Sequence, residues 1–328
     1  MAMRRESGNL EDLPPLELRP LRDLDLDEPS HPGRPAHLSA ASGVVRRGDF
    51  VYVIGDDELS LAVFRLTSPE PGTLRRALLG ELPSGDAERG KAKPDLEALT
   101  VLPPFAGNPF GALLGVGSGS GPDRDRGFVW ALAPDGSLRD DPRELDLGPV
   151  YRMLRERIEE LNVEGACVMG ERLWLLHRGN QGASGSVIAE IALDRLVDSL
   201  GSDLRVDPEE LADVRAYDLG ELGGVSLAFS DATPIGGDVL VFTASAEVSG
   251  DAGPDGAIRG SVVGTISLDG RVQRLRTIDR RFKVEGVHAS IDTGVLDFLF
   301  VCDQDDPATP SPLLSAAMPL RGEFEREG

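Results

Sequence analysis

Short apolar runs that end in polar clusters recur along the chain and predict a protein built of β-strands. The clearest copy covers residues 161–180, where a short strand with a glutamate near its start is followed by a tight turn and a more apolar second strand. Runs of this length between turn residues are typical of strands. Similar openings stand at residues 95–99 and 283–287. The pattern therefore indicates an internal repeat with a carboxylate at one fixed place.

Five such units can be traced, and their first strands start near residues 40, 95, 163, 224 and 284. Each unit shows three strands and the first four show a fourth, which is typical of the blades of a β-propeller. The fifth unit lacks an outer strand, and the alternating apolar and charged residues 16–27 can supply it. We therefore predict an all-β fold, a five-bladed β-propeller whose ring is closed by an N-terminal strand. A six-bladed ring with one degenerate blade is the alternative.

Other segments interrupt the strand pattern. Residues 149–161 place their apolar side chains on one face of a helix, and short helices are also expected at residues 193–200 and 208–214, within an insertion at 193–214. Residues 1–15 are polar and contain prolines, which predicts a loose N-terminal segment. Residues 16–328 would then form a single propeller domain.

The charge of the chain bears on its partners. Its 328 residues carry a formal net charge of −22, which argues against nucleic acids and anionic membranes as partners because both attract basic surfaces. Neither a secretion signal nor an apolar run of 18 residues is visible, so we expect a cytoplasmic protein. We further expect a monomer. Cys167 and Cys302 fall in apolar strands, which predicts buried free thiols.

The fixed carboxylate of the repeat suggests chemistry at the propeller axis. The first strand of each blade lines the axis, so residues at the starts of these strands meet near one mouth. The aligned positions are Ser42, Glu97, Glu164, Ser226 and Glu285. Three carboxylates at close range raise each other's pKa, and a hard cation such as Ca²⁺ relieves the repulsion. Alternatively, each glutamate caps backbone N–H groups and holds neighbouring blades together.

The second strands end in polar residues near the same mouth. Ser118 and Ser120, with Arg124 close behind, could form an anion nest, and a flexible turn is the alternative. His177 is the acid/base candidate, although a buried, hydrogen-bonded histidine is the commoner case. Arg178 could clamp an anion or form a salt bridge to a neighbouring blade. The candidate ligand-binding residues at the strand ends are therefore Ser118, Ser120, Arg124, His177, Arg178 and Asn180.

Lysine is rare in this chain. Among 34 basic residues only Lys91, Lys93 and Lys283 are lysines, and all three closely precede a repeat glutamate. They could bind the phosphate or carboxylate of a substrate beside the carboxylates. They could equally pair with the glutamates and take the place of a metal. Both interpretations remain open from the residues.

Several of these segments resemble known families. Residues 93–98, 117–120, 161–166 and 178–180 resemble an uncharacterised bacterial family of propeller-like proteins of unknown function, over roughly residues 36–306. More distantly, the strand pair within residues 163–175 is similar to a blade of β-propeller phytases and phytase-like esterases. That resemblance implies calcium ligation by Glu164, then by Glu97 and Glu285, with nearby lysines and arginines holding phosphate.

Two functions are compatible with this pattern. The first is a calcium-dependent hydrolase, similar to a phosphoesterase or esterase, that acts on a small anionic molecule such as a phosphorylated one. In it Glu97, Glu164 and Glu285 hold the metal, and His177 and Arg178 are the catalytic candidates. The second is a non-catalytic propeller that binds a ligand or a protein partner at the same mouth. The tail at residues 177–180 departs from the acidic strand end of phytases, so phytate hydrolysis itself is not implied.

Overall fold

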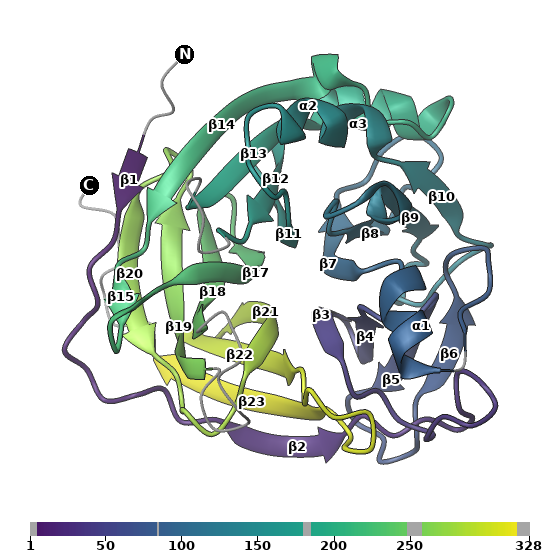
Figure 1. Cartoon of the computed structure of the whole chain (residues 1–328), viewed down its shortest axis with the longest axis horizontal. Coiled ribbons are helices and arrows are strands. Elements are labelled where there is room, and N and C mark those ends of the chain that lie inside the picture. The colour runs from purple at the N-terminus through teal and green to yellow at the C-terminus, as the bar shows by residue number, and fades with distance from the viewer. Residues whose placement is uncertain (1–4, 84, 180–184, 248–257, 320–328) are drawn as a thin grey trace.

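Five β-sheets surround a common axis in the computed structural model of the chain (Figure 1). The structure describes residues 5–83, 85–179, 185–247 and 258–319. Each sheet contains four strands that follow one another from the axis outwards, each antiparallel to its neighbour. This is the arrangement of a propeller blade. The five-bladed β-propeller predicted from the sequence is therefore confirmed.

The strands of each blade follow one another outwards from the axis. Blade 1 contains β3 (Ala41–Arg47), β4 (Phe50–Gly55), β5 (Ser60–Arg65) and β6 (Thr73–Arg76). Blade 2 contains β7 (Leu96–Leu102), β8 (Ala112–Gly117), β9 (Arg126–Ala131) and β10 (Arg143–Asp146). Blade 3 contains β11 (Val163–Met169), β12 (Arg172–His177), β13 (Ser186–Ala192) and β14 (Leu211–Asp218). Blade 4 contains β17 (Ala228–Ile235), β18 (Val239–Glu247), β19 (Ile258–Ser267) and β20 (Val272–Thr277). Blade 5 contains β21 (Val284–Asp292), β22 (Val295–Cys302), β23 (Pro312–Pro319) and, from the N-terminal segment, β2 (Arg19–Asp23).

The N-terminal segment closes the ring. Strand β2 pairs antiparallel with β23, so the outer strand of blade 5 comes from within residues 16–27, as predicted. The preceding residues differ from the loose segment expected at 1–15, since β1 (Arg5–Ser7) pairs parallel with β14 of blade 3. The amide of Glu11 then donates to Leu275 of blade 4 at 2.7 Å, and the amide of Leu16 donates to Thr277 at 2.8 Å. The backbone groups of these polar residues are therefore satisfied by the outer strands of two blades.

The apolar core lies between the blades. Every pair of neighbouring blades shares one cluster of buried aliphatic and aromatic side chains. Trp174 is buried between blades 3 and 4, and Trp130 between blades 1 and 2. Cys167 and Cys302 are buried free thiols, as expected. Because the packing lies between blades, the starts of the first strands remain available for polar side chains.

The helices agree with the sequence only in part. Helix α2 (Gly148–Arg155) ends earlier than residue 161, although Ile158 and Leu161 stay buried in the following turns and extend the apolar pattern. Helix α3 (Leu193–Gly201) was expected. The helix predicted at 208–214 is wrong, because a 3-10 turn at Pro208–Glu210 leads directly into β14, which pairs with β13. Helix α1 (Asp86–Ala92) was not predicted. Among the described residues, no helix has the length and apolarity needed to cross a membrane.

The strand register shifts once near the start of each first strand. The residues at the shift are Ser42, Glu97, Glu164, Ser230 and Glu285. An extra residue of this kind bends a strand and redirects its side chain. The alignment of Ser226 with these positions was wrong, because Ser226 belongs to a separate small hairpin of β15 (Glu221–Leu222) and β16 (Val225–Ser226). The apolar residues around Ser226 resemble the start of a strand, but they lie four residues before the actual shift at Ser230.

Candidate functional site

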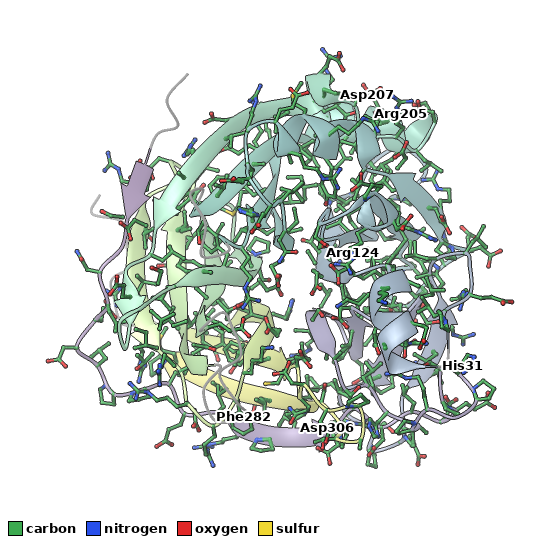
Figure 2. The ribbon with its side chains drawn as sticks, in the orientation of Figure 1. His31, Arg124, Arg205, Asp207, Phe282 and Asp306 are labelled. Carbon is green, nitrogen blue, oxygen red and sulfur yellow. The ribbon has the colours of Figure 1, made fainter. Side chains whose placement is uncertain are left out.

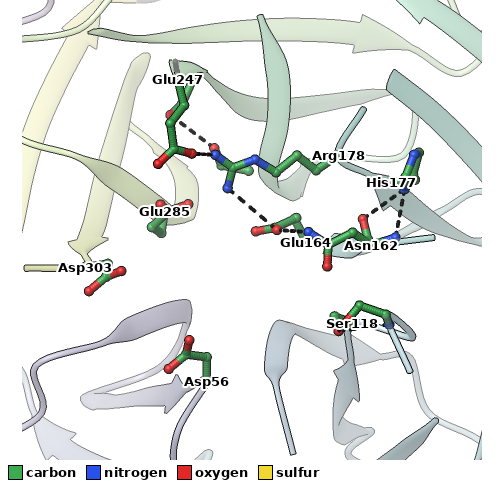
Figure 3. Close-up of polar contacts among 12 residues, drawn as sticks. Asp56, Ser118, Asn162, Glu164, His177, Arg178, Glu247, Glu285 and Asp303 are labelled. Atoms are coloured by element: carbon green, nitrogen blue, oxygen red, sulfur yellow. Dashed lines mark hydrogen bonds and ion pairs between the residues drawn. The ribbon is translucent and has the colours of Figure 1, made fainter. Parts of the chain in front are cut away.

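Charged side chains from blades 1, 3, 4 and 5 gather at one end of the propeller axis (Figure 3). We call this end the axial mouth and define it by the starts of β3, β7, β11, β17 and β21 and the ends of β4, β8, β12, β18 and β22. Because neighbouring strands in a blade are antiparallel, these starts and ends lie at the same edge. The repeat thus delivers one polar residue from each strand start and each strand end to the mouth.

Three carboxylates of blades 1 and 2 form a compact group at this mouth. One oxygen each from Asp56, Asp95 and Glu97 lies within 4.8 Å of the others. Nζ of Lys93 lies 2.7 Å from Oδ1 of Asp95 and also pairs with Asp56. Glu97 makes no hydrogen bond or ion pair with any described residue. One lysine therefore compensates two of the three acids and leaves the third without a direct partner.

The protonation of these acids is set by burial and by their neighbours. Burial raises the pKa of Asp56 to about 6 even though Lys93 opposes the shift. Burial, and next the charge of Glu164, hold the pKa of Glu97 well above its usual range. Burial acts in the same direction on Asp95, but Lys93 and the hydroxyl of Ser118 outweigh it and the pKa of Asp95 is lowered. Three acids in contact with one another therefore differ in their affinity for protons.

The side chains of Ser118, Ser120 and Arg124, which were predicted to form an anion nest, bind the chain's own Asp95. Oδ2 of Asp95 accepts hydrogen bonds from the hydroxyls of Ser118 and Ser120, the latter at 3.2 Å, and from Nη1 of Arg124 at 2.9 Å. Arg124 lies on the inner side of blade 2 (Figure 2). The backbone of Asp95 has a φ of 55°, in the left-handed region. The sequence thus located a real oxyanion cradle, but its occupant comes from the same chain.

Glu164 of blade 3 is held by two donors (Figure 3). Its Oε1 accepts a hydrogen bond from Nδ2 of Asn162 at 2.6 Å and lies 3.6 Å from Nη1 of Arg178. Arg178 also pairs with Glu247 of blade 4. Burial raises the pKa of Glu164 to about 7, with Arg178 opposing the shift and Glu285 adding to it. Arg178 therefore forms the salt bridge to a neighbouring blade that was one of its two interpretations.

Lys283 joins the acids of blades 4 and 5. Its Nζ lies 3.4 Å from Oε1 of Glu285, 3.4 Å from Oδ2 of Asp303 and 3.7 Å from Oε1 of Glu247. Burial raises the pKa of Asp303 to about 6. Oε2 of Glu285 is buried and has no hydrogen-bond partner among the described residues. The axial mouth is thus a network in which three cations are shared among more carboxylates.

The other predicted site residues are His177, Lys91 and Asn180. His177 is 2% exposed, and its Nδ1 accepts a hydrogen bond from the amide of Asn162 at 3.0 Å. Burial lowers the pKa of His177 to about 4, which fits a buried, hydrogen-bonded histidine. Lys91 is exposed in the last turn of α1 and makes no ion pair with a described residue. Asn180 lies outside the described residues.

Asp231 was missed from the sequence. It is fully buried beside Ser230, and its carboxylate accepts hydrogen bonds from the amides of Ala232 at 2.7 Å and of Val287, on the next blade, at 2.8 Å. Burial raises its pKa well above the usual range. The other four blades have a glycine or an alanine after the register shift, namely Gly43, Ala98, Gly165 and Gly286. A correct alignment of blade 4 would have singled out this carboxylate.

The residues that could hold a metal differ from the predicted set. Among the described residues, the group with metal-ligand spacing is Asp56, Asp95 and Glu97. Of the predicted ligands only Glu97 belongs to it, while Glu164 and Glu285 face Arg178 and Lys283. The oxygen donors suit Ca²⁺. However, the ammonium group of Lys93 already pairs with two of the three acids, so an ion would have to displace it.

The fold and the axial mouth define a five-bladed propeller protein with a charged axial site. The chain belongs to a family of unknown function, DUF6929, whose model matches residues 37–318. No curated protein sequence matches the chain significantly. The family agrees with the first resemblance inferred from the sequence, whereas the resemblance to phytases is not shown by these comparisons.

Solved structures share the fold. The catalytic domain of the GH62 α-L-arabinofuranosidase of Coprinopsis cinerea is 12% identical, with a TM-score of 0.51 over 96% of this chain and 97% of that one. An engineered GH43 glycoside hydrolase with endo-xylanase and exo-arabinofuranosidase activity is 13% identical, with a TM-score of 0.51 over 88% of this chain. The chain spans about half, 51%, of the length of that enzyme. Likeness at this level of identity concerns the fold alone.

Proposed function

We propose that the axial mouth is a hydrolytic site for a small molecule, in which carboxyl groups supply the acid and the base. The observation that carries this proposal is the contrast between Glu97 and Asp56. Their oxygens lie within 4.8 Å of each other, yet Asp56 pairs with Lys93 while Glu97 pairs with no described residue. Two carboxyl groups whose surroundings push their protonation apart are the usual arrangement of an acid and a base.

The roles follow from the pKa of each group. Glu97 holds its proton to a higher pH than an ordinary glutamate, because burial and the charge of Glu164 keep its pKa well above the usual range. It can therefore protonate the oxygen of a leaving group. Asp56, with a pKa of about 6, is mostly ionised at neutral pH and can take a proton from the attacking water. Protons given and taken balance over the hydrolysis of one bond.

The substrate class that we propose first is a glycoside. The support is the shared fold with two glycoside hydrolases, whose chemistry commonly uses a pair of carboxyl groups. Arg178 and Lys283 at the same mouth would suit a substrate that also carries a carboxylate or phosphate. Such a substrate would be a small anionic molecule, as expected from the sequence. A phosphoester is the second candidate, and the same two cations favour it.

Calcium dependence is a separate part of the proposal. It requires an ion among Asp56, Asp95 and Glu97, where Lys93 already supplies positive charge. We propose that Lys93 replaces the ion in the resting protein. Hydrolysis that survives a chelator would support this version, whereas loss of hydrolysis with a chelator and its recovery with Ca²⁺ would support a bound ion.

A panel of chromogenic substrates tests the proposal. The purified protein is assayed with nitrophenyl glycosides, including an arabinofuranoside, a xyloside and a glucuronide, and with nitrophenyl phosphate and acetate. We expect turnover of one class, reduced about 100-fold or more in Glu97→Gln and in Asp56→Asn. Glu88→Gln on the exposed surface of α1 is the matched control and should be unchanged. Absence of turnover would favour a non-catalytic ligand-binding propeller, and turnover that Glu97→Gln leaves intact would show that Glu97 is not the acid.

A further inference from the structure

A large cleft lies between blades 5 and 1, away from the axial mouth. Its volume is about 1100 Å³. Blade 5 forms one wall, and Arg46 of β3 with residues 66–69 of blade 1 forms the facing wall. The first strands leave the mouth at Ser42 and Glu285 and reach the cleft at Arg46 and His288. That is roughly 10–13 Å further along each strand, at about 3.3 Å per residue.

The cleft opens where apolar packing between the two blades stops. Nearer the mouth, Val44 and Val53 of blade 1 pack with Val301 of blade 5 in one buried cluster. Further along blade 5, polar residues stand among the apolar residues that line the cleft. His288 pairs across the sheet with Leu299, which pairs with Ser315, and Ser290 pairs with Asp297. The sequence therefore places polar side chains where the apolar packing between blades 5 and 1 would otherwise continue.

Several polar side chains of this cleft lack partners among the described residues, whereas Arg22 and Ser315 in the same lining bond to backbone carbonyls. Nε of Arg46 donates to the carbonyl of Gly48 at 2.9 Å, and its two terminal nitrogens make no hydrogen bond with a described residue. The side chains of His288, Ser290 and Asp297 likewise have no hydrogen bond or ion pair with the described part of the chain. This differs from the axial mouth, where Lys93, Arg178 and Lys283 are all paired.

The chemistry of these groups defines the ligand. A guanidinium group whose two terminal nitrogens are open binds a carboxylate or a phosphate in bidentate fashion along that edge. Burial, and next the charges of Arg46 and Arg47, lower the pKa of His288 to about 4, so a neutral imidazole faces the cleft. Asp297 and Ser290 offer acceptors and a donor that suit hydroxyl groups. The carboxylate of Asp297 also disfavours a polyanion, since like charges repel.

We infer that the cleft between blades 5 and 1 binds a hydroxylated organic anion, a sugar acid or a sugar phosphate, through Arg46 and His288. The anionic group lies against Arg46 and the hydroxyls face Asp297 and Ser290. The volume of the cleft, about 1100 Å³, slightly exceeds that of typical small-molecule sites, which is about 300–1000 Å³. This site is independent of the acid/base chemistry proposed at the mouth.

Calorimetric titration of the full chain with four probes tests the site. The probes are glucuronate, glucose 6-phosphate, glucose and inorganic phosphate, all at millimolar concentration. We expect binding of glucuronate or glucose 6-phosphate and much weaker binding of glucose. The comparison of the two anionic sugars shows which anionic group the site takes. If neither binds the wild-type protein, the inference is overturned.

Two arginines next to each other provide the control. Arg46→Gln should weaken binding about 10- to 100-fold, as expected for a lost charged hydrogen bond. Arg47→Gln removes the same charge from the adjacent exposed residue, which does not line the cleft, and should bind like the wild type. Equal losses in both variants would indicate a nonspecific charge effect and overturn the site. Loss in Arg178→Gln with binding kept in Arg46→Gln would place the ligand at the axial mouth and also overturn it.

Discussion

Nζ of Lys93 lies 2.7 Å from Oδ1 of Asp95 and pairs with Asp56 as well, so an ammonium group stands at the point where a metal ion would meet its ligands. Lys93→Met would leave these carboxylates without a cation. We expect the free energy of unfolding to fall by about 2 kcal/mol, less than for a fully buried pair because water screens part of the interaction. We also expect Ca²⁺ to raise the thermal midpoint of this variant.

Lys91→Met is the matched control, because Lys91 is exposed and has no ion-pair partner among the described residues. Its midpoint should match the wild type with calcium and with a chelator. Thermal unfolding of all three proteins under both conditions is the measurement. A calcium-dependent rise in the wild-type midpoint would contradict the idea that Lys93 replaces the ion.

The burial of Glu164 should make stability depend on pH in a defined direction. The pKa of this group is 4.5 when unperturbed and about 7 in the folded protein. The folded state therefore holds the proton more tightly, so the contribution to stability is complete below pH 4.5 and is lost as the pH rises through 7. Relative to Glu164→Gln, the wild type should lose about 3 kcal/mol across this window. Urea unfolding at both ends of the window measures it.

An exposed glutamate controls for the substitution itself. Glu171→Gln, at an exposed position before β12, should show no difference from the wild type that varies with pH. If the difference between wild type and Glu164→Gln were constant across the window, Glu164 would be ionised in the folded protein throughout, and its role beside Glu97 would have to be revised.

Asp231 should contribute to stability by joining blades 4 and 5. Asp231→Ala removes the acceptor for the amides of Ala232 and Val287 in a fully buried place. We expect a loss of about 2–4 kcal/mol in the free energy of unfolding, since each unsatisfied buried donor costs about 1–3 kcal/mol. Asp292→Ala, at the exposed end of β21, is the control. Chemical denaturation distinguishes the two, and equal stabilities would show that water replaces the carboxylate.

Local patterns were sufficient to predict the blades. Alternating and continuous apolar runs located the strands, and the missing outer strand of blade 5 pointed to residues 16–27, where β2 is found. The same rule failed in blade 4, because the apolar residues around Ser226 imitate a strand start. Helix α1 was missed because it has no apolar face. Its Arg89 is instead anchored by Asp57 and Glu58, and such tertiary ion pairs leave no periodic signal.

The partners at the axial mouth were the least predictable feature. The sequence located the glutamates and the cations but not which acid pairs with which base. Arg178 reaches Glu247 across a blade boundary, and Lys283 reaches Asp303 twenty residues further along the chain. The cradle of Ser118 and Arg124 was recognised, yet its occupant, Asp95, was not. These contacts depend on where the register shift turns each side chain, which a single sequence does not encode as a local pattern.

Because β2 closes the ring, the stability of the propeller should depend on β2 much more than on β1. Removal of residues 1–8 takes away β1, which only extends the outer edge of blade 3, and the chain should keep the oligomeric state of the full chain and a similar thermal midpoint. Removal of residues 1–23 also takes away β2 and the buried Leu16 and Leu18, and it exposes the edge of β23. An unpaired edge beside lost apolar packing favours association with other chains. Size-exclusion chromatography and thermal unfolding should therefore show aggregation or a much lower midpoint for the longer deletion alone. If residues 24–328 remained a monomer of wild-type stability, the N-terminal strand would not be needed to close the propeller.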